Sequence, residues 1–123
     1  MKTILKLLSF FIILFFFYSC ASVGVTKSKS YPAKAADCNL DIYFSESEIK
    51  KPFEVIALID SKTGSNAFAK KTVSAAIDLA KPKACECGAD AILVVQMDKE
   101  GVTAGGYGFG KAMIKCLKYL NNK

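Results

Sequence analysis

Four cysteines follow residue 37, and they are the residues of this chain with the widest range of chemistry. Cys85 and Cys87 are separated by one residue in "ACECGADA", and Cys38 and Cys116 lie far from them in the sequence. Cysteine thiols can hold a metal, carry redox chemistry or form disulfides. The compartment decides between these roles, because structural disulfides persist in exported proteins and are rare in the cytosol.

The first residues of the chain predict export. Lys2 and Lys6 flank the start of an apolar run over residues 7–17, which is the plan of a secretory signal. The run is shorter than the about 20 apolar residues that a membrane-spanning helix needs. "FYSC" resembles the lipobox of bacterial lipoproteins. We therefore expect residues 1–19 to be a lipoprotein signal peptide and Cys20 to carry the lipid.

The residues after Cys20 predict how the folded part is held. Residues 20–37 are small, polar and basic, which favours a flexible tether, and residues 38–123 then form one small domain. Ala21 is not the aspartate that often retains lipoproteins at the inner membrane, which favours the outer membrane. We expect the domain on the periplasmic side of that membrane. Two alternatives stay open: an anchor helix that is never cut, and cleavage after Ala21 by the ordinary signal peptidase.

Charge and composition narrow the classes of function. The formal net charge is +6, the cations are lysines, and histidine is absent. An exported chain without arginine is a poor match to nucleic-acid binding, because arginine is the usual reader of bases. The lack of histidine removes the commonest general base. Glu46 and Glu48, in "SESEIKKP", have no evident catalytic partner. We therefore expect a protein that is not an enzyme and holds no cofactor.

A glycine-rich stretch, "GGYGFGKA", comes close to the phosphate-binding pattern G-x-x-x-x-G-K-[ST]. Ala112 stands where that pattern has the hydroxyl that binds magnesium, and no strand leads directly into Gly105. We therefore expect no nucleotide here. A hairpin loop with Tyr107 and Phe109 at its tip is the better interpretation, and these two rings are candidate contacts to a partner or to the membrane.

The periodicity of the domain predicts its elements. Alternating or continuous apolar residues predict strands over residues 39–44, 53–60 and 90–97, the last buried on both faces. A helix is expected between the second and third of these strands. Pro82 predicts a kink in this helix or the start of a second short helix, and Gly88 is suited to end it. The apolar face of that helix has steps of three and four residues and comprises Val73, Ala76, Ile77, Ala80, Ala84 and Cys87.

At this level the chain resembles a known family. The order of "IYFSESEIKKPFEVIALID", a helix, "GADAILV" and "GKAMIK" is similar to the small periplasmic domain of the Rcs phosphorelay sensor lipoproteins (the RcsF-like family), over residues 39–118. The best markers are Pro52-Phe53 and Gly88 to Ala91. The resemblance implies that the C-terminal segment, whose pattern alone fits a helix or a strand, is a strand.

The expected fold is then α+β, in the order β-β-α-β-β, with one helix packed on a mixed four-stranded sheet. A right-handed crossover makes the second and third of these strands parallel. The cysteines can be placed on this plan. Cys85 and Cys87 are about 200° apart on a helix, so each needs a different partner.

We expect two disulfides, which join Cys85 and Cys87, in an order left open, to Cys38 and Cys116. The alternatives are four free thiols and a four-thiolate zinc site, for which C-x-C on a helix is poorly shaped.

The resemblance also implies a function, namely an envelope-stress sensor or interaction lipoprotein that is held in the membrane by the lipid on Cys20 and contacts another envelope protein. Two alternatives remain. One is a periplasmic module that binds a small ligand or a metal, and the other is a structural domain of a larger envelope assembly.

Overall fold

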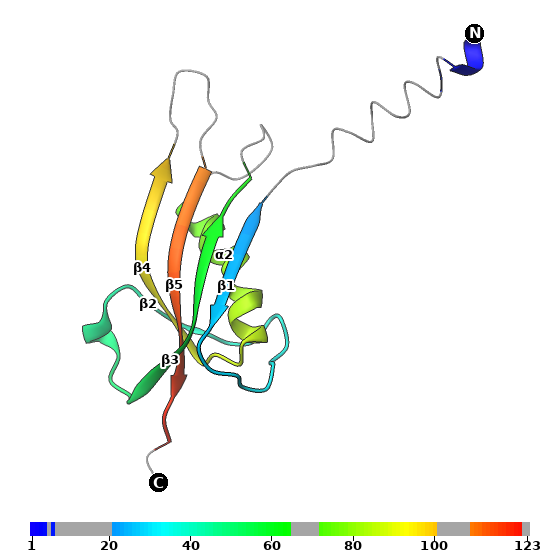
Figure 1. Cartoon of the computed structure of the whole chain (residues 1–123). Coiled ribbons are helices and arrows are strands. Elements are labelled where there is room, and N and C mark those ends of the chain that lie inside the picture. The colour runs from blue at the N-terminus through cyan, green and yellow to red at the C-terminus, as the bar shows by residue number, and fades with distance from the viewer. Residues whose placement is uncertain (5, 7–20, 65–71, 101–108, 122–123) are drawn as a thin grey trace.

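The computed structural model describes residues 1–4, 6, 21–64, 72–100 and 109–121. These residues form five strands, one longer helix and one short 3-10 helix around a single sheet (Figure 1). The elements are β1 (Ser22–Lys27), β2 (Asp41–Tyr43), η1 (Glu46–Glu48), β3 (Phe53–Lys62), α2 (Val73–Glu86), β4 (Ala91–Glu100) and β5 (Phe109–Tyr119).

The strands of the described residues lie in the order β1-β3-β5-β4-β2. The pairs β1–β3, β3–β5 and β4–β5 are antiparallel, and β2 pairs with β4 in parallel. Helix α2 covers one face of the sheet, as Figure 1 shows. The expected α+β fold, with one main helix on a mixed sheet, is therefore confirmed. β3 and β4 run in the same direction, as expected for the two strands that flank the helix in sequence, but β5 lies between them.

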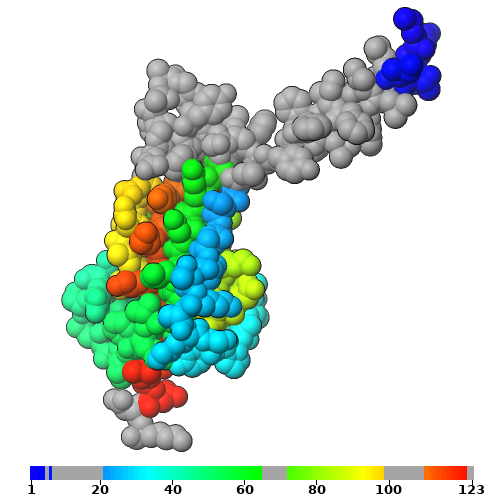
Figure 2. Space-filling view, viewed as in Figure 1, coloured from blue at the N-terminus to red at the C-terminus, as the bar shows by residue number. Residues whose placement is uncertain are grey.

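Two parts of the expectation are wrong, and both concern the segment before residue 38. The sheet has five strands rather than four, because Ser22–Lys27 pairs with β3. Residues 20–37 are therefore not a flexible tether throughout. Val23 and Val25 alternate with exposed neighbours and pack against the core, which is strand periodicity in a stretch too short and too polar to stand out. Figure 2 shows β1 along one edge of the sheet.

The larger core lies between the sheet and α2. It takes its side chains from the apolar face of α2 and from β3, β4 and β5, and its most buried large members are Ile56, Ile59, Ile92 and Ile114. The predicted helix face is confirmed, since Ala76, Ile77, Ala80, Ala84 and Cys87 are all buried and Val73 is half-buried against the same cluster. A bulge between Val55 and Ala57 turns both Ile56 and Ala57 into this core.

A smaller core lies on the other face of the sheet, at the start of β4 and the end of β5. Ala91, Leu93 and Leu117 are buried there beneath Tyr43, Ile49, Phe53, Val55 and Tyr119. The expectation that residues 90–97 are buried on both faces holds for Ala91–Val94 alone. A second bulge, between Val94 and Gln96, breaks the register, and Val95 and Met97 are about half exposed.

The ends of α2 follow ordinary capping rules. The Thr72 hydroxyl accepts a hydrogen bond from the Ala75 amide at 3.2 Å, which satisfies a free donor of the first turn. Gly88 follows the helix with φ +82°, the left-handed conformation that favours glycine, so its predicted role is confirmed. Pro82 lies inside one continuous helix, Val73–Glu86, rather than starting a second one.

The start of α2 is also held to the sheet by close contacts. The Ser61 hydroxyl donates to the Ala76 carbonyl at 2.6 Å in the buried interior. Gly110 of β5 lies directly against the start of the helix, where an added Cβ atom would be 2.2 Å from the Thr72 carbonyl oxygen. An added Cβ at Gly24, on β1, would have its nearest neighbour, the Asp60 carbonyl oxygen, at 3.8 Å.

These two glycines give a matched pair of variants. We expect Gly110→Ala to lower the free energy of unfolding by about 1–3 kcal/mol, because the methyl group must push the helix from the sheet. Gly24→Ala should change it by less than about 0.5 kcal/mol, since the site has room. Urea unfolding of both variants measures the difference. Equal effects would contradict the close packing of β5 against the start of α2.

Candidate functional site

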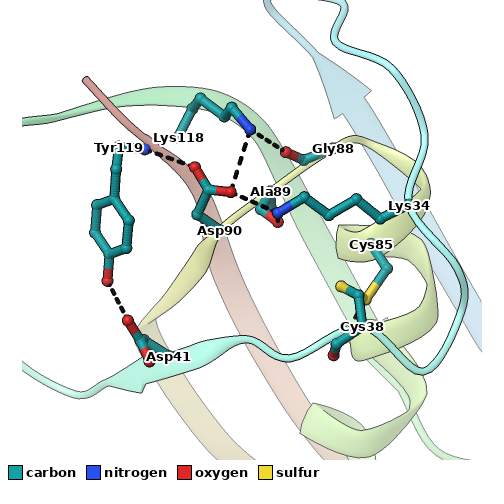
Figure 3. Close-up of polar contacts among 9 residues, drawn as sticks. All are labelled: Lys34, Cys38, Asp41, Cys85, Gly88, Ala89, Asp90, Lys118 and Tyr119. Atoms are coloured by element: carbon teal, nitrogen blue, oxygen red, sulfur yellow. Dashed lines mark hydrogen bonds and ion pairs between the residues drawn. A yellow bond between two sulfur atoms is a disulfide. The ribbon is translucent and has the colours of Figure 1, made fainter. Parts of the chain in front are cut away.

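The disulfide joins the segment before β2 to the last turn of α2. Cys38 and Cys85 are bonded with an S–S distance of 2.10 Å and a Cα–Cα distance of 5.9 Å. Cys85 is 1% exposed but lies outside the apolar cluster that contains Cys87. This agrees with the predicted separation of the two side chains around the helix. One of the two expected disulfides is thus confirmed, with Cys38 as the partner of Cys85 (Figure 3).

The second expected disulfide, between Cys87 and Cys116, is absent among the described cysteines. Both are free thiols and both lie in the core between the sheet and α2. They pack there as small apolar side chains, a common role of a buried free cysteine. Burial, and to a lesser extent the neighbouring Cys87, raise the pKa of Cys116 to about 12. A thiol in this state is a poor nucleophile and a poor metal ligand.

The zinc alternative also meets an obstacle in this arrangement. Two of the four sulfur atoms are bonded to each other, so they cannot ligate a metal as thiolates. In the parts of the chain that the structure describes, no group of three or more His, Cys, Asp or Glu side chains is placed to hold a metal ion.

Next to the disulfide, the Asp90 carboxylate collects hydrogen bonds from segments far apart in the sequence (Figure 3). Its Oδ1 accepts from Lys34 and, at 3.1 Å, from Lys118, and its Oδ2 accepts from the Tyr119 amide at 3.0 Å. The two ammonium groups also donate to the carbonyls that precede Asp90, Lys34 to Ala89 at 2.8 Å and Lys118 to Gly88 at 3.2 Å. We call these groups the Asp90 cluster.

The Asp90 cluster continues to the edge strand β2 through a tyrosine. The Tyr119 hydroxyl donates to the Asp41 carboxylate at 2.6 Å and lies 2.9 Å from the Tyr43 hydroxyl. The Lys51 ammonium lies over the Tyr119 ring, 4.5 Å from its centre. Burial, and then the hydrogen bonds to Asp41 and Tyr43, raise the pKa of Tyr119, so its hydroxyl stays protonated and keeps donating.

A second group of polar contacts holds the start of residues 28–40, the segment between β1 and β2. Lys29 and Tyr31 both donate to the Glu54 carboxylate on β3. The Lys118 ammonium lies 5.5 Å from the centre of the Tyr31 ring, so the two groups are neighbours. The hydrogen bond from Lys29, and then that from Tyr31, lower the pKa of Glu54 and keep it charged. Residues 28–40 are thus held against the rest of the domain at several points, by Lys29 and Tyr31 through Glu54 and by Lys34 through Asp90.

The candidate residues from the sequence fall in different places. Cys20 and Tyr107 lie outside the described residues, and Phe109 begins β5 with a side chain that is likewise not described. Glu48 caps its own turn, because its carboxylate accepts from the amides of Phe44 at 3.2 Å and Ser45 at 3.4 Å. The structure therefore brings together Cys38 and Cys85, and separately Cys87 and Cys116 within one core.

Sequence reasoning missed the Asp90 cluster. Asp90 itself lies within the Gly88–Ala91 marker, where an aspartate directly before a buried strand was a usable signal. Its partners Lys34 and Lys118 carry no signal, because lysines on a basic chain look like ordinary surface residues. The chemical effect of the cluster is to fix the Asp90 carboxylate and the ammonium groups of Lys34 and Lys118 in position. Each ionised group in it faces an opposite charge or a hydrogen-bond donor, so it joins three segments into one unit.

The cysteine assignment predicts a thiol count. With Cys20 replaced by alanine, the full chain unfolded without reductant should react at two thiols, Cys87 and Cys116, and at four after reduction. The native protein should react slowly, since both thiols are buried. Ellman's reagent measures all three states. No reactive thiol before reduction would mean that the second disulfide forms, and four would mean that neither does.

The pKa of Asp90 predicts acid sensitivity. Burial alone would raise this pKa, but the hydrogen bonds from Lys34, the Tyr119 amide and Lys118 outweigh it and lower it. A lowered folded-state pKa stabilises the fold above the unfolded value near 3.8, and the stabilisation is lost as the pH falls through the folded pKa. We expect Asp90→Asn to cost about 1–3 kcal/mol at neutral pH.

The difference between Asp90→Asn and the unchanged protein should narrow below about pH 4, as the native carboxylate takes up its proton. Asp78→Asn is the matched control, because Asp78 is 66% exposed and pairs with Lys81 on the surface of α2. That change should cost less than about 0.5 kcal/mol at any pH. Urea unfolding over a pH series measures both. A gap that does not vary with pH would show that Asp90 does not titrate as described.

Comparisons with known proteins bear on this site as follows. No protein family model, no curated protein and no solved structure matches the chain significantly. Among the residues that the structure describes, no helix is both long and apolar enough to cross a bilayer. The function is therefore argued below from the sequence and from the geometry of the site.

Proposed function

We propose that this chain is a lipid-anchored protein of the bacterial cell envelope that works as a non-enzymatic sensor or interaction module. The observation that carries the proposal is the Cys38–Cys85 disulfide in a chain that begins with a signal-like segment ending in "FYSC". A disulfide that joins residues 47 positions apart in a small domain is typical of proteins that fold outside the cytosol.

The polar groups of the described residues support binding rather than catalysis. Two carboxylates with lowered pKa values and charged hydrogen-bond partners, Asp90 and Glu54, hold residues 28–40 to the sheet, and a third, Glu86, pairs with Lys83 on the surface of α2. Catalytic groups with shifted pKa values are more often poised to exchange protons with a substrate. A rigid domain with its chain fastened in this way suits a protein that presents a fixed surface to another molecule.

The resemblance to the Rcs phosphorelay sensor lipoproteins specifies the proposal further. It favours a role in envelope-stress signalling, an outer-membrane anchor with the domain on the periplasmic side, and an envelope protein as the partner. Tyr107 and Phe109 remain candidate contacts for that partner. The anchor is the part of the proposal that chemistry tests most directly, because two or more acyl chains make membrane binding effectively permanent.

We expect the mature protein to begin at Cys20 and to carry acyl chains on it. Intact-protein mass spectrometry and labelling with an alkyne fatty acid measure this, and Cys20→Ala should lose the label and leave the membrane fraction. Cys38→Ala is the matched control, since it removes a cysteine without touching the anchor. A mature chain that begins at Ser22 without acyl mass would contradict the lipoprotein assignment in favour of ordinary signal cleavage.

A further inference from the structure

The first strand begins almost at the proposed anchor. Cys20 is followed by Ala21, and β1 starts at Ser22 and is paired with Lys62 from that residue onward. Two residue steps span at most about 7 Å. If Cys20 is acylated, the sheet therefore has no free tether between it and the bilayer. This step rests on the proposed lipid anchor.

The pairing registers identify which end of the sheet this is. Ser22 pairs with Lys62, Lys62 with Lys111, and Lys111 with Asp98, so these four residues form one row across β1, β3, β5 and β4. We call it the upper row, because it crosses the sheet near the end where β1 starts, at the top of Figure 1, although β4 and β5 stay paired beyond it for two more residues. Phe53 pairs with Tyr119 at the other end of the sheet, which we call the lower end.

The dimensions of the bilayer place the two ends at different depths. The headgroup layer of one leaflet is about 5–8 Å thick, which matches the reach of about 7 Å from an acylated Cys20. The nine residue steps from Lys62 to Phe53 along β3 span about 30 Å. We propose that the upper row lies in the headgroup layer of the membrane and that the lower end stands about 30 Å away from it.

The charges of the upper row fit this placement. Lys62 and Lys111 bring two ammonium groups to one end of the sheet, and lysines at a membrane surface are attracted to anionic headgroups. The acidic member, Asp98, accepts a hydrogen bond from Gln96 at 2.6 Å and leaves the row with two lysines against one carboxylate. The Asp90 cluster lies at the lower end, since Asp90 accepts from the amide of Tyr119, and Figure 1 shows η1 near the same end. In the proposed placement both would face the aqueous space.

Three positions, two on β5 and one directly after it, test the proposal. Lys111 and Lys115 are both half-buried lysines on the same face of the same strand, and they are about 14 Å apart along it. Leu120 follows β5 beyond the lower end and is 44% exposed. Each is replaced in turn by the photo-crosslinker p-benzoylphenylalanine in the full lipoprotein, which is then placed in vesicles of phosphatidylethanolamine and phosphatidylglycerol.

We expect a lipid adduct from position 111, a weaker one from position 115 and none above background from position 120. Inserting a Gly-Ser spacer of about 15 residues between Ala21 and Ser22, with a root-mean-square span of about 20 Å, should remove the adduct at position 111. The same spacer placed after Lys123 is the matched control and should leave that adduct unchanged.

Lysine acetylation of the protein without crosslinker gives a second measurement that needs no substitution within the folded domain. Lys111 should react more slowly on vesicles than it does in the chain with the N-terminal spacer. Lys50 and Lys51, next to the lower end, should react equally in both. An unchanged rate at Lys111 would overturn the proposal.

The outcomes separate the two proposals. Equal adducts at positions 111 and 115 in an acylated protein would mean that the sheet lies flat on the membrane, and this overturns the upright placement while leaving the anchor intact. An acylated protein without an adduct at position 111, or with one that survives the N-terminal spacer, overturns it as well. A chain that carries no acyl group on Cys20 overturns both the lipid anchor and the placement.

Discussion

The attachment of residues 28–40 is the constraint on which the rest of the structure depends. This segment joins β1 and β2, which lie at opposite edges of the sheet, so it must cross the whole width of the domain. It does so past the end of α2, where the Lys34 amide donates to the Cys85 carbonyl at 2.9 Å. Neither edge strand has a second neighbour in the described sheet, so the fastening of this segment determines whether both edges stay in place.

The interactions that hold residues 28–40 are of different physical kinds, and they therefore complement one another. The disulfide limits the freedom of the unfolded chain and does not depend on pH over the ordinary range. The carboxylates of Asp90 and Glu54 depend on ionisation and lose their partners in acid. The half-buried Val23, Val25 and Tyr31 add apolar contact with the main core. A domain with a core of small side chains, many of them alanines, gains rigidity from holding its longest connection in several ways.

The sequence was informative where the pattern is local and less so where partners come from distant segments. The helix face and Gly88 were predictable, because steps of three and four residues and a glycine after them follow from helix geometry alone. β1 was not, because two valines among small polar residues give too little alternation. The Asp90 cluster needs Lys34 and Lys118, 56 and 28 residues away from Asp90, and the single sequence contains no sign of that pairing. The prediction that Cys85 and Cys87 need different partners agrees with their different surroundings, but the sequence did not show that Cys87 would be enclosed in the core as a free thiol.

The spacing of Cys85 and Cys87 also has a consequence for the order of events during folding. In the unfolded chain the two thiols are nearly equivalent targets for Cys38, since they differ by two positions in a loop of almost fifty residues. In the folded chain Cys85 meets Cys38 and Cys87 is enclosed in the core. The helix is what makes them different, and helices form in microseconds whereas disulfides form in seconds or longer. Correct oxidation is therefore expected to follow the docking of α2 on the sheet, so that the native disulfide forms in a chain that has already folded.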